Sequence, residues 1–210
     1  MNKKLLGVLI IIAALLIIGV PYYQSYQDNL LSEHFNETMK NASSIQEGIT
    51  STINDFNTKN STDADTLMTT INNQLTPEYS EEQLRLNESA MCTSNETEHK
   101  YIDLQLKRVT LESQSLNLTV TSLNAIAQYV RGEKNGEDAQ NTLNKVQTDM
   151  TNNNNELNQV YTDIQNLLKE NPDLDKKLHD LNLAPAFYGQ PATQNITNTT
   201  QNMTTENSTQ

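Results

Sequence analysis

The pattern of apolar and polar positions along the chain contains one continuous apolar run, Leu5 to Val20, which directly follows Lys3 and Lys4. As a helix rising ~1.5 Å per residue, residues 5–23 would cover about 28 Å, close to the ~30 Å hydrocarbon core of a bilayer. The two lysines favour a cytoplasmic stub over residues 1–4 by the positive-inside rule. We therefore predict a single-pass transmembrane anchor in the cell membrane, with the later residues extracellular.

A cleaved signal peptide is the alternative interpretation of the same run. Such peptides usually have an apolar core of about 7–15 residues that ends in a small-x-small site. The best candidate site, Ile17-Ile18-Gly19, has a bulky residue where a small one is required, and Pro21 follows closely. We therefore favour the retained anchor.

After this run, apolar residues recur at alternating spacings of four and three, the pattern of helices that pack along a narrow seam. The first stripe consists of Leu31, Phe35, Thr38, Ala42, Ile45, Ile49, Thr52 and Phe56. A shorter stripe consists of Leu67, Met68, Ile71 and Leu75. They predict helices at about residues 26–58 and 63–75, within a first extracellular segment over residues 24–76.

Two longer stripes flank a turn at Gly132–Gly136. The first consists of Ile102, Leu106, Val109, Ser113, Leu116, Val120, Leu123, Ala127 and Val130. The second consists of Ala139, Leu143, Val146, Met150, Asn153, Leu157, Val160, Ile164 and Leu167. Folded back at the turn, the stripes stack layer by layer, from Val130 against Ala139 to Ile102 against Leu167. This register predicts an antiparallel helical hairpin.

The hairpin helices are predicted at about residues 78–131 and 137–170, and with a short helix at about 173–182 they fill residues 77–183. Pro77 marks the helix start, because proline suits the first helical position. The polar stretch from Cys92 to His99 is the weakest part of the first long helix.

The helix over residues 100–131 carries a second apolar stripe, which predicts that it lies between two neighbours. This stripe consists of Leu104, Leu111, Leu118 and Ala125. The expected fold is all-α: an N-terminal transmembrane helix, then an extended hairpin within a three-helix, coiled-coil-like bundle. Residues 184–210 are rich in Asn, Thr and Gln and are predicted to form a disordered tail.

Composition narrows the possible functions. The net charge is −12, and an acidic surface repels phosphate, so we expect no nucleic-acid partner. Apolar residues make up 35% of the chain and tryptophan is absent, which favours slender helical packing over a thick core.

Ten Asn-x-Ser/Thr sequons are candidate N-glycosylation sites, about twice as many as a random arrangement of this composition gives. They are Asn36, Asn41, Asn60, Asn87, Asn95, Asn117, Asn195, Asn198, Asn202 and Asn207. Enrichment of polar residues alone is the alternative explanation. We predict a glycoprotein.

No pattern in the sequence predicts catalysis, a cofactor or a metal site. His34, His99 and His179 are isolated from other metal-ligating residues. The acidic pairs Glu81-Glu82 and Glu137-Asp138 are expected in first turns of helices, where they favour the helix dipole. We therefore predict that the chain is not an enzyme.

Two single residues leave alternatives open. Cys92 is a partly buried small apolar residue or an intermolecular thiol. Asn153 either specifies register in the hairpin seam or belongs to an exposed, loosened run over Asn152–Asn155. We expect Asn153 to lie partly desolvated against a leucine, so Asn153→Leu should raise the thermal stability of a closed hairpin seam, because such burial costs about 1–3 kcal/mol. If the run is exposed or locally open, the substitution should be neutral.

The leading hypothesis is a membrane-anchored extracellular coiled-coil protein with a structural or protein-interaction role at the cell surface. Its partners would be the bilayer and an envelope protein or a second copy. An alternative is an extracytoplasmic sensing or ligand-binding bundle that acts with a separate signalling partner. Receptors of the chemoreceptor type use such helical bundles, but they also carry a second membrane helix and a cytoplasmic output domain.

A third hypothesis is a filament subunit. The first ~55 residues resemble type IV pilins, in which an apolar N-terminal segment continues into an amphipathic helix. The chain lacks the charged residue that pilins carry directly before the glycine at Gly7. Ile12 stands where their early glutamate would be.

Overall fold

The computed structural model describes residues 29–55 and 64–191. These residues form helices and connecting turns, with no strand among them, so the predicted all-α class is confirmed. The predicted anchor at residues 5–23 lies outside the described residues, as do the stub and residues 192–210. In the part that is described, no helix combines the length and the apolar character needed to cross a membrane.

The elements follow one another as a series of helices of very different lengths. They are a helix over residues 29–55, α2 (Ala64–Thr70), the π-helix η1 (Ile71–Leu75), α3 (Thr76–Met91), α4 (Glu96–Val130), α5 (Gly136–Glu170), α6 (Pro172–Leu181) and the 3-10 helix η2 (Pro185–Tyr188).

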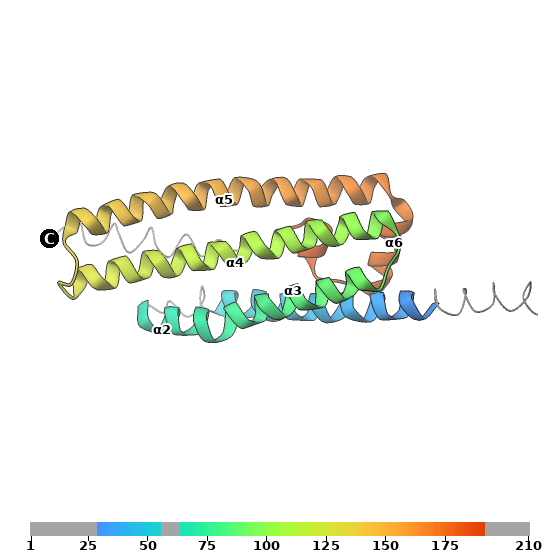
Figure 1. Cartoon of the computed structure of the whole chain (residues 1–210), viewed down its shortest axis with the longest axis horizontal. Helices are drawn as coiled ribbons and strands as arrows, with labels where there is room; N and C mark the ends of the chain where they lie inside the picture. Colours follow the sequence, from blue (N-terminus) through green and yellow to red (C-terminus); the bar gives the residue numbers. More distant parts are fainter. Residues whose placement is uncertain (1–28, 56–63, 192–210) are drawn as a thin grey trace, which may run out of the picture.

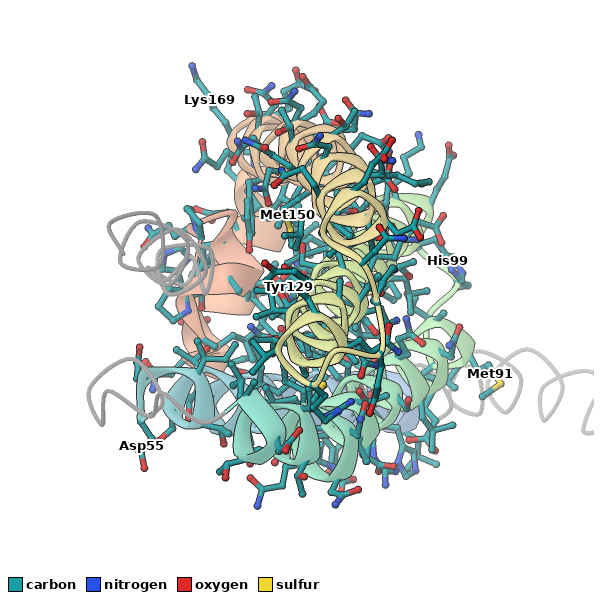
Figure 2. The ribbon with its side chains drawn as sticks, turned by 90° about the vertical axis from the view of Figure 1, so that its left-hand side faces the viewer. Asp55, Met91, His99, Tyr129, Met150 and Lys169 are labelled. Carbon is teal, nitrogen blue, oxygen red and sulfur yellow. The ribbon has the colours of Figure 1, made fainter. Side chains whose placement is uncertain are left out.

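The helices stack in layers along one long axis (Figure 1). α4 and α5 run side by side as the predicted antiparallel hairpin. On its other side, α4 packs against α3, and the helix over residues 29–55 lies in the same layer as α3. Figure 2 looks along the axis and shows Met150 of α5 directed toward α4, whereas Lys169 points away from the bundle. α4 is therefore the middle layer, as its two apolar stripes indicate.

The predicted helix over residues 78–131 is two helices in the structure. α3 ends at Met91, and α4 begins at Glu96 after a short turn. Asn95 caps α4: its side-chain oxygen accepts hydrogen bonds from the backbone N–H groups of Thr97 (2.8 Å) and Glu98 (3.2 Å). The break falls in the polar stretch because an asparagine cap satisfies N–H groups that a new helix start leaves free.

Pro77 lies in the first turn of α3, as predicted, but no break in the helix precedes it. The chain is already helical from Ala64, and Leu75 before α3 has right-handed helical backbone angles. Pro77 has no N–H to donate to the preceding turn, and that turn is the wider π-helix η1. A local change of helix type therefore accommodates the proline without a break.

The predicted disordered tail is wrong for its first part. Residues 183–190, here called the C-terminal strap, pack into the bundle, with Phe187 fully buried and Ala184 and Ala186 almost so. Gly189 has φ +70°, and an added Cβ would lie 2.5 Å from the backbone oxygen of Tyr161. The strap is ordered because its apolar side chains are buried in the bundle. The prediction missed them because it averaged the composition of residues 184–210, most of which are Asn, Thr and Gln.

Two predicted seam positions are exposed instead. Val130 is 72% exposed, because it is the last residue of α4, where the chain leaves for the turn. Leu31 is 39% exposed, because it lies two turns before Thr38, which contacts Ser89 near the end of α3. The helical spacing predicted that both residues are buried, but no described element covers them fully.

Candidate functional site

Polar side chains from four helices meet in the interior of the bundle. We call this set the buried polar cluster: Gln46, Glu82, Gln105, Arg108, Glu112 and Tyr161. Glu82, Gln105 and Arg108 have no solvent-exposed surface, and Gln46 is almost as deeply buried. Gln105, Arg108 and Glu112 come from α4 at spacings of three and four, so they share one side of that helix.

Arg108 is the centre of the cluster. Its Nε donates to Gln105 (2.8 Å), and its Nη1 donates to Gln46 (3.0 Å) and Glu112 (2.9 Å). Its Nη2 donates to Glu82 Oε1. The guanidinium also lies over the Phe187 ring, 5.2 Å from the ring centroid. One side chain thus joins α3, α4, the helix over residues 29–55 and the C-terminal strap.

Two carboxylates share this one guanidinium. Burial raises the pKa of Glu82 to about 7, and nearby Glu112 adds to the rise while Arg108 opposes it. Burial alone would lower the pKa of Arg108, but Glu112 and Glu82 raise it overall, so Arg108 stays charged. The second oxygen of Glu82, Oε2, is buried and has no hydrogen-bond partner. With both carboxylates ionised, the buried charges leave an excess of one negative charge.

Tyrosine hydroxyls complete the polar interior. Tyr161 donates to Glu112 Oε1 (2.7 Å), whereas Tyr101 donates to the backbone oxygen of Phe187 (2.8 Å). Gln105 Nε2 donates to the same Phe187 oxygen (3.1 Å). Burial raises the pKa values of Tyr101 and Tyr161, so both hydroxyls remain protonated donors. The cluster is therefore bonded to the strap as well as to the helices.

Such an arrangement favours one packing of the helices over others. Removing a charge from water is costly, so a buried pair stabilises only the arrangement in which every partner is in place. The side chains of the cluster form hydrogen bonds with one another and with the strap. This arrangement suits a structural centre better than an open reaction site. Among the described residues, no group of three or more His, Cys, Asp or Glu side chains could hold a metal ion.

The acidic pairs differ from the prediction in one case. Glu82, like Glu81, lies beyond the first turn of α3, which begins at Thr76 and has Glu78 as its first-turn acid. It is instead the buried partner of Arg108. Glu137 and Asp138 do lie in the first turn of α5, as predicted, and Asn135 caps that helix.

The histidines are spread over separate surfaces. His34 lies 3.8 Å from Glu37, and His179 lies 3.3 Å from Asp175. The ring of His179 also lies against Tyr188 of the strap, with 4.5 Å between centroids. The structure brings none of the three histidines together.

Cys92 is a free, half-buried thiol that packs against the apolar core. Burial raises its pKa, and Glu88 adds to the rise, so the reactive thiolate is disfavoured. Its neighbour Met91 is 75% exposed and points away from the bundle in Figure 2.

Asn153 is buried in the hairpin seam and has hydrogen-bond partners. Its side-chain amide donates to the backbone oxygen of Leu111 (2.8 Å) and to the hydroxyl of Ser115 (2.7 Å). The run Asn152–Asn155 lies within the regular helix α5. The structure therefore favours the register interpretation, and the expected unpartnered amide is wrong.

The described sequons lie on the first helices of the chain. Asn41, Asn87, Asn95 and Asn117 are exposed, and Asn36 is half-buried. The hydroxyls two residues after three of them are buried, on Ser43, Ser89 and Thr119. Asn60 and the four sequons from Asn195 onward lie outside the described residues.

Sequence analysis missed the buried polar cluster. A weak signal exists: Gln105, Arg108 and Glu112 follow the same spacing as the apolar stripes of their helix. Their partners Gln46 and Glu82, however, lie on elements whose position relative to α4 the sequence does not specify.

Comparison with protein-family models, curated proteins and solved structures finds no match to this chain.

Proposed function

We propose that the chain is a membrane-anchored extracellular helical rod with a structural or protein-contact role, and that it carries N-linked glycans. The observation that supports this role most is the buried polar cluster. It joins helices of both layers to α4 with the protein's own side chains, so it serves the stiffness of a long bundle (Figure 1). The apolar run Leu5 to Val20 supplies the proposed anchor.

Glycosylation at Asn41, Asn87 and Asn117 would have to precede folding, because the hydroxyls two residues later are buried. Sugar transfer requires the hydroxyl two residues after the asparagine, and Ser89 after Asn87 has no exposed surface. Ser89 also donates hydrogen bonds to Thr38 (2.6 Å) and to the backbone oxygen of Arg85 (3.0 Å). We therefore expect modification while the chain is being exported and is still unfolded.

Placement is tested by protease treatment of intact cells that express the chain, followed by fractionation. We expect digestion of the helical region from outside, with a short membrane-bound fragment that keeps the original N-terminus. Removal of N-glycans should shift the apparent mass of the intact chain. A mature protein that starts near Pro21 and is found in the medium would contradict the anchor, and an unshifted mass would contradict the glycans.

For the protein contact, we propose that two copies meet through the exposed side of α5. None of the ten sequons falls on α5, although this helix contains eight asparagines. Exposed uncharged side chains recur along it at helical spacing: Asn141, Thr148, Asn152, Asn155, Gln159 and Thr162. This side carries no sequon and is mostly uncharged. Lys145, which falls at the same spacing, forms an ion pair with Asp149, so the side adds little to the repulsion that the net charge of −12 imposes elsewhere.

An added glycan tests this surface in a host that uses the sequons. Asn154→Thr creates a sequon at Asn152 on α5, and Leu31→Thr creates a control sequon at Asn29 on the helix over residues 29–55. We expect chemical cross-linking of the unaltered chain on cells to yield a dimer. The glycan at Asn152 should abolish it, and the glycan at Asn29 should not. Monomers from the unaltered chain, or an unchanged dimer with Asn152 modified, would rule out this surface.

A further inference from the structure

A continuous path of polar contacts leads from Glu82 to the C-terminal strap. Glu82 accepts from Arg108, Arg108 donates to Gln105 (2.8 Å), and Gln105 donates to the backbone oxygen of Phe187 (3.1 Å). The guanidinium and the Phe187 ring are also in direct contact. A change of charge at Glu82 therefore reaches the strap through one side chain, Arg108.

We propose that the buried polar cluster is a proton-dependent lock, in which Glu82 holds the strap docked when protonated and loosens it when ionised. The protonated form balances one guanidinium against one carboxylate, that of Glu112. The ionised form buries a second carboxylate, with one oxygen that no donor reaches. Water can satisfy this oxygen only if the packing around it opens.

The groups that face Glu82 account for the direction of the effect. α4 presents Arg108 and Glu112, α5 presents Tyr161, and Tyr79 lies on the same helix as Glu82. The helix over residues 29–55 presents the uncharged Gln46, and the strap presents the Phe187 ring. Arg108 is the only cation among these groups. Ionisation of Glu82 is therefore opposed by the negative charge of Glu112, and no second positive charge compensates it.

The strap is a short element that a few hydrogen bonds join to the helices. Tyr101 and Gln105 donate to the Phe187 oxygen (2.8 and 3.1 Å), the Ala184 N–H donates to Ser43 Oγ (2.6 Å), and Gln165 Nε2 donates to the Gly189 oxygen (2.7 Å). It also precedes the four sequons from Asn195 onward in the sequence. The lock would therefore control how firmly the strap is held as the pH changes, whether or not the chain acts as a surface rod.

The test is hydrogen exchange of the strap amides in the full-length chain between pH 5 and 8, normalised to the intrinsic exchange rate at each pH. The amides of Ala184, Phe187 and Gly189 report opening, because each donates a hydrogen bond within the docked strap. We expect their protection to fall as the pH rises from 5 toward about 7, by up to about tenfold per pH unit, and to level off above that, as one linked proton requires. The amides of Arg131 and Gly132 at the hairpin turn should show no such trend.

The variants make the test specific. Glu82→Gln mimics the protonated side chain and should keep the strap protected at every pH. Glu81→Gln, next to it on the exposed side of α3, should behave as the unaltered chain. Protection that does not change with pH in the unaltered chain would overturn the lock. So would a pH dependence that Glu82→Gln leaves in place.

Discussion

At the scale of single residues, Arg108 shows how the interior accepts a permanent charge. Its guanidinium donates to four side chains and lies over an aromatic ring, so it is solvated by the protein instead of by water. Breaking a buried ion pair by removing one partner is costly, because the remaining charge stays buried.

We expect Arg108→Met to lower the free energy of unfolding by about 3–5 kcal/mol, because it leaves Glu82 and Glu112 without their cation. Arg85→Met is the matched control. Arg85 forms ion pairs with Glu81 and Glu88 on the surface of α3, where water replaces them readily. Denaturant unfolding of both variants measures the difference, and similar losses would argue against a stabilising role of the cluster.

Glu82 should make stability depend on pH in an unusual direction. Its pKa is about 7 in the folded chain against an ordinary value of 4.5, so the folded state binds the proton more tightly. Its contribution is therefore fully present below pH 4.5 and is lost as the pH rises toward about 7. The difference in unfolding free energy between the unaltered chain and Glu82→Gln isolates this effect. A difference that instead grows with pH would show that Glu82 ionises readily.

Asn153 is expected to stabilise the hairpin, contrary to the expectation from sequence alone. Asn153→Leu removes two hydrogen bonds from a buried amide, to Leu111 and Ser115, and should lower the free energy of unfolding by about 1 kcal/mol. Asn155→Leu, on the exposed side of the same helix, is the control and should change stability little. A higher melting temperature for Asn153→Leu alone would show that the amide is poorly satisfied.

At the scale of elements, the sequence predicts what periodic burial determines and misses what single side chains decide. The hairpin follows from two apolar stripes of matching register, and the structure contains it. The break after Met91 depends on the cap at Asn95, which a stripe does not contain. The strap is too short for any periodicity, and its order depends on Phe187 and on a glycine at one position.

Gly189→Ala should release the strap. The new Cβ would lie 2.5 Å from the Tyr161 backbone oxygen and 2.8 Å from Gln165 Cγ, at a positive φ of +70°. Gly132→Ala is the control, since Gly132 has a similar φ of +73° but nothing within 4 Å of the added Cβ. Protease susceptibility near residue 190 should rise only for Gly189→Ala. Equal susceptibility near residue 190 in the two variants would contradict release of the strap by the added Cβ.

At the scale of the whole molecule, α4 is the element on which the remote parts of the chain converge. Its middle position follows from its two apolar stripes, and the all-helical class follows from the heptad spacing. Which remote residues it joins does not follow, because Gln46 and Glu82 look like surface residues of their own helices in the sequence. They are buried only because the helix over residues 29–55 and α3 both pack against α4.

The helix over residues 29–55 and the C-terminal strap close on each other around the buried polar cluster, and one engineered disulfide tests this arrangement most directly. The backbone N–H of Ala184 donates to Ser43 Oγ at 2.6 Å, although the two residues are far apart in the sequence. In a Cys92→Ser background, Ser43→Cys with Ala184→Cys should therefore form an intramolecular disulfide, which requires Cα atoms within about 7 Å. Ser44→Cys with Ala184→Cys is the matched control, because Ser44 is exposed whereas Ser43 is buried. The measurement is mass spectrometry of the oxidised, proteolysed chain. The account predicts a linked peptide pair for Ser43 and none for Ser44, and equal linkage of both, or linkage of neither, would contradict it.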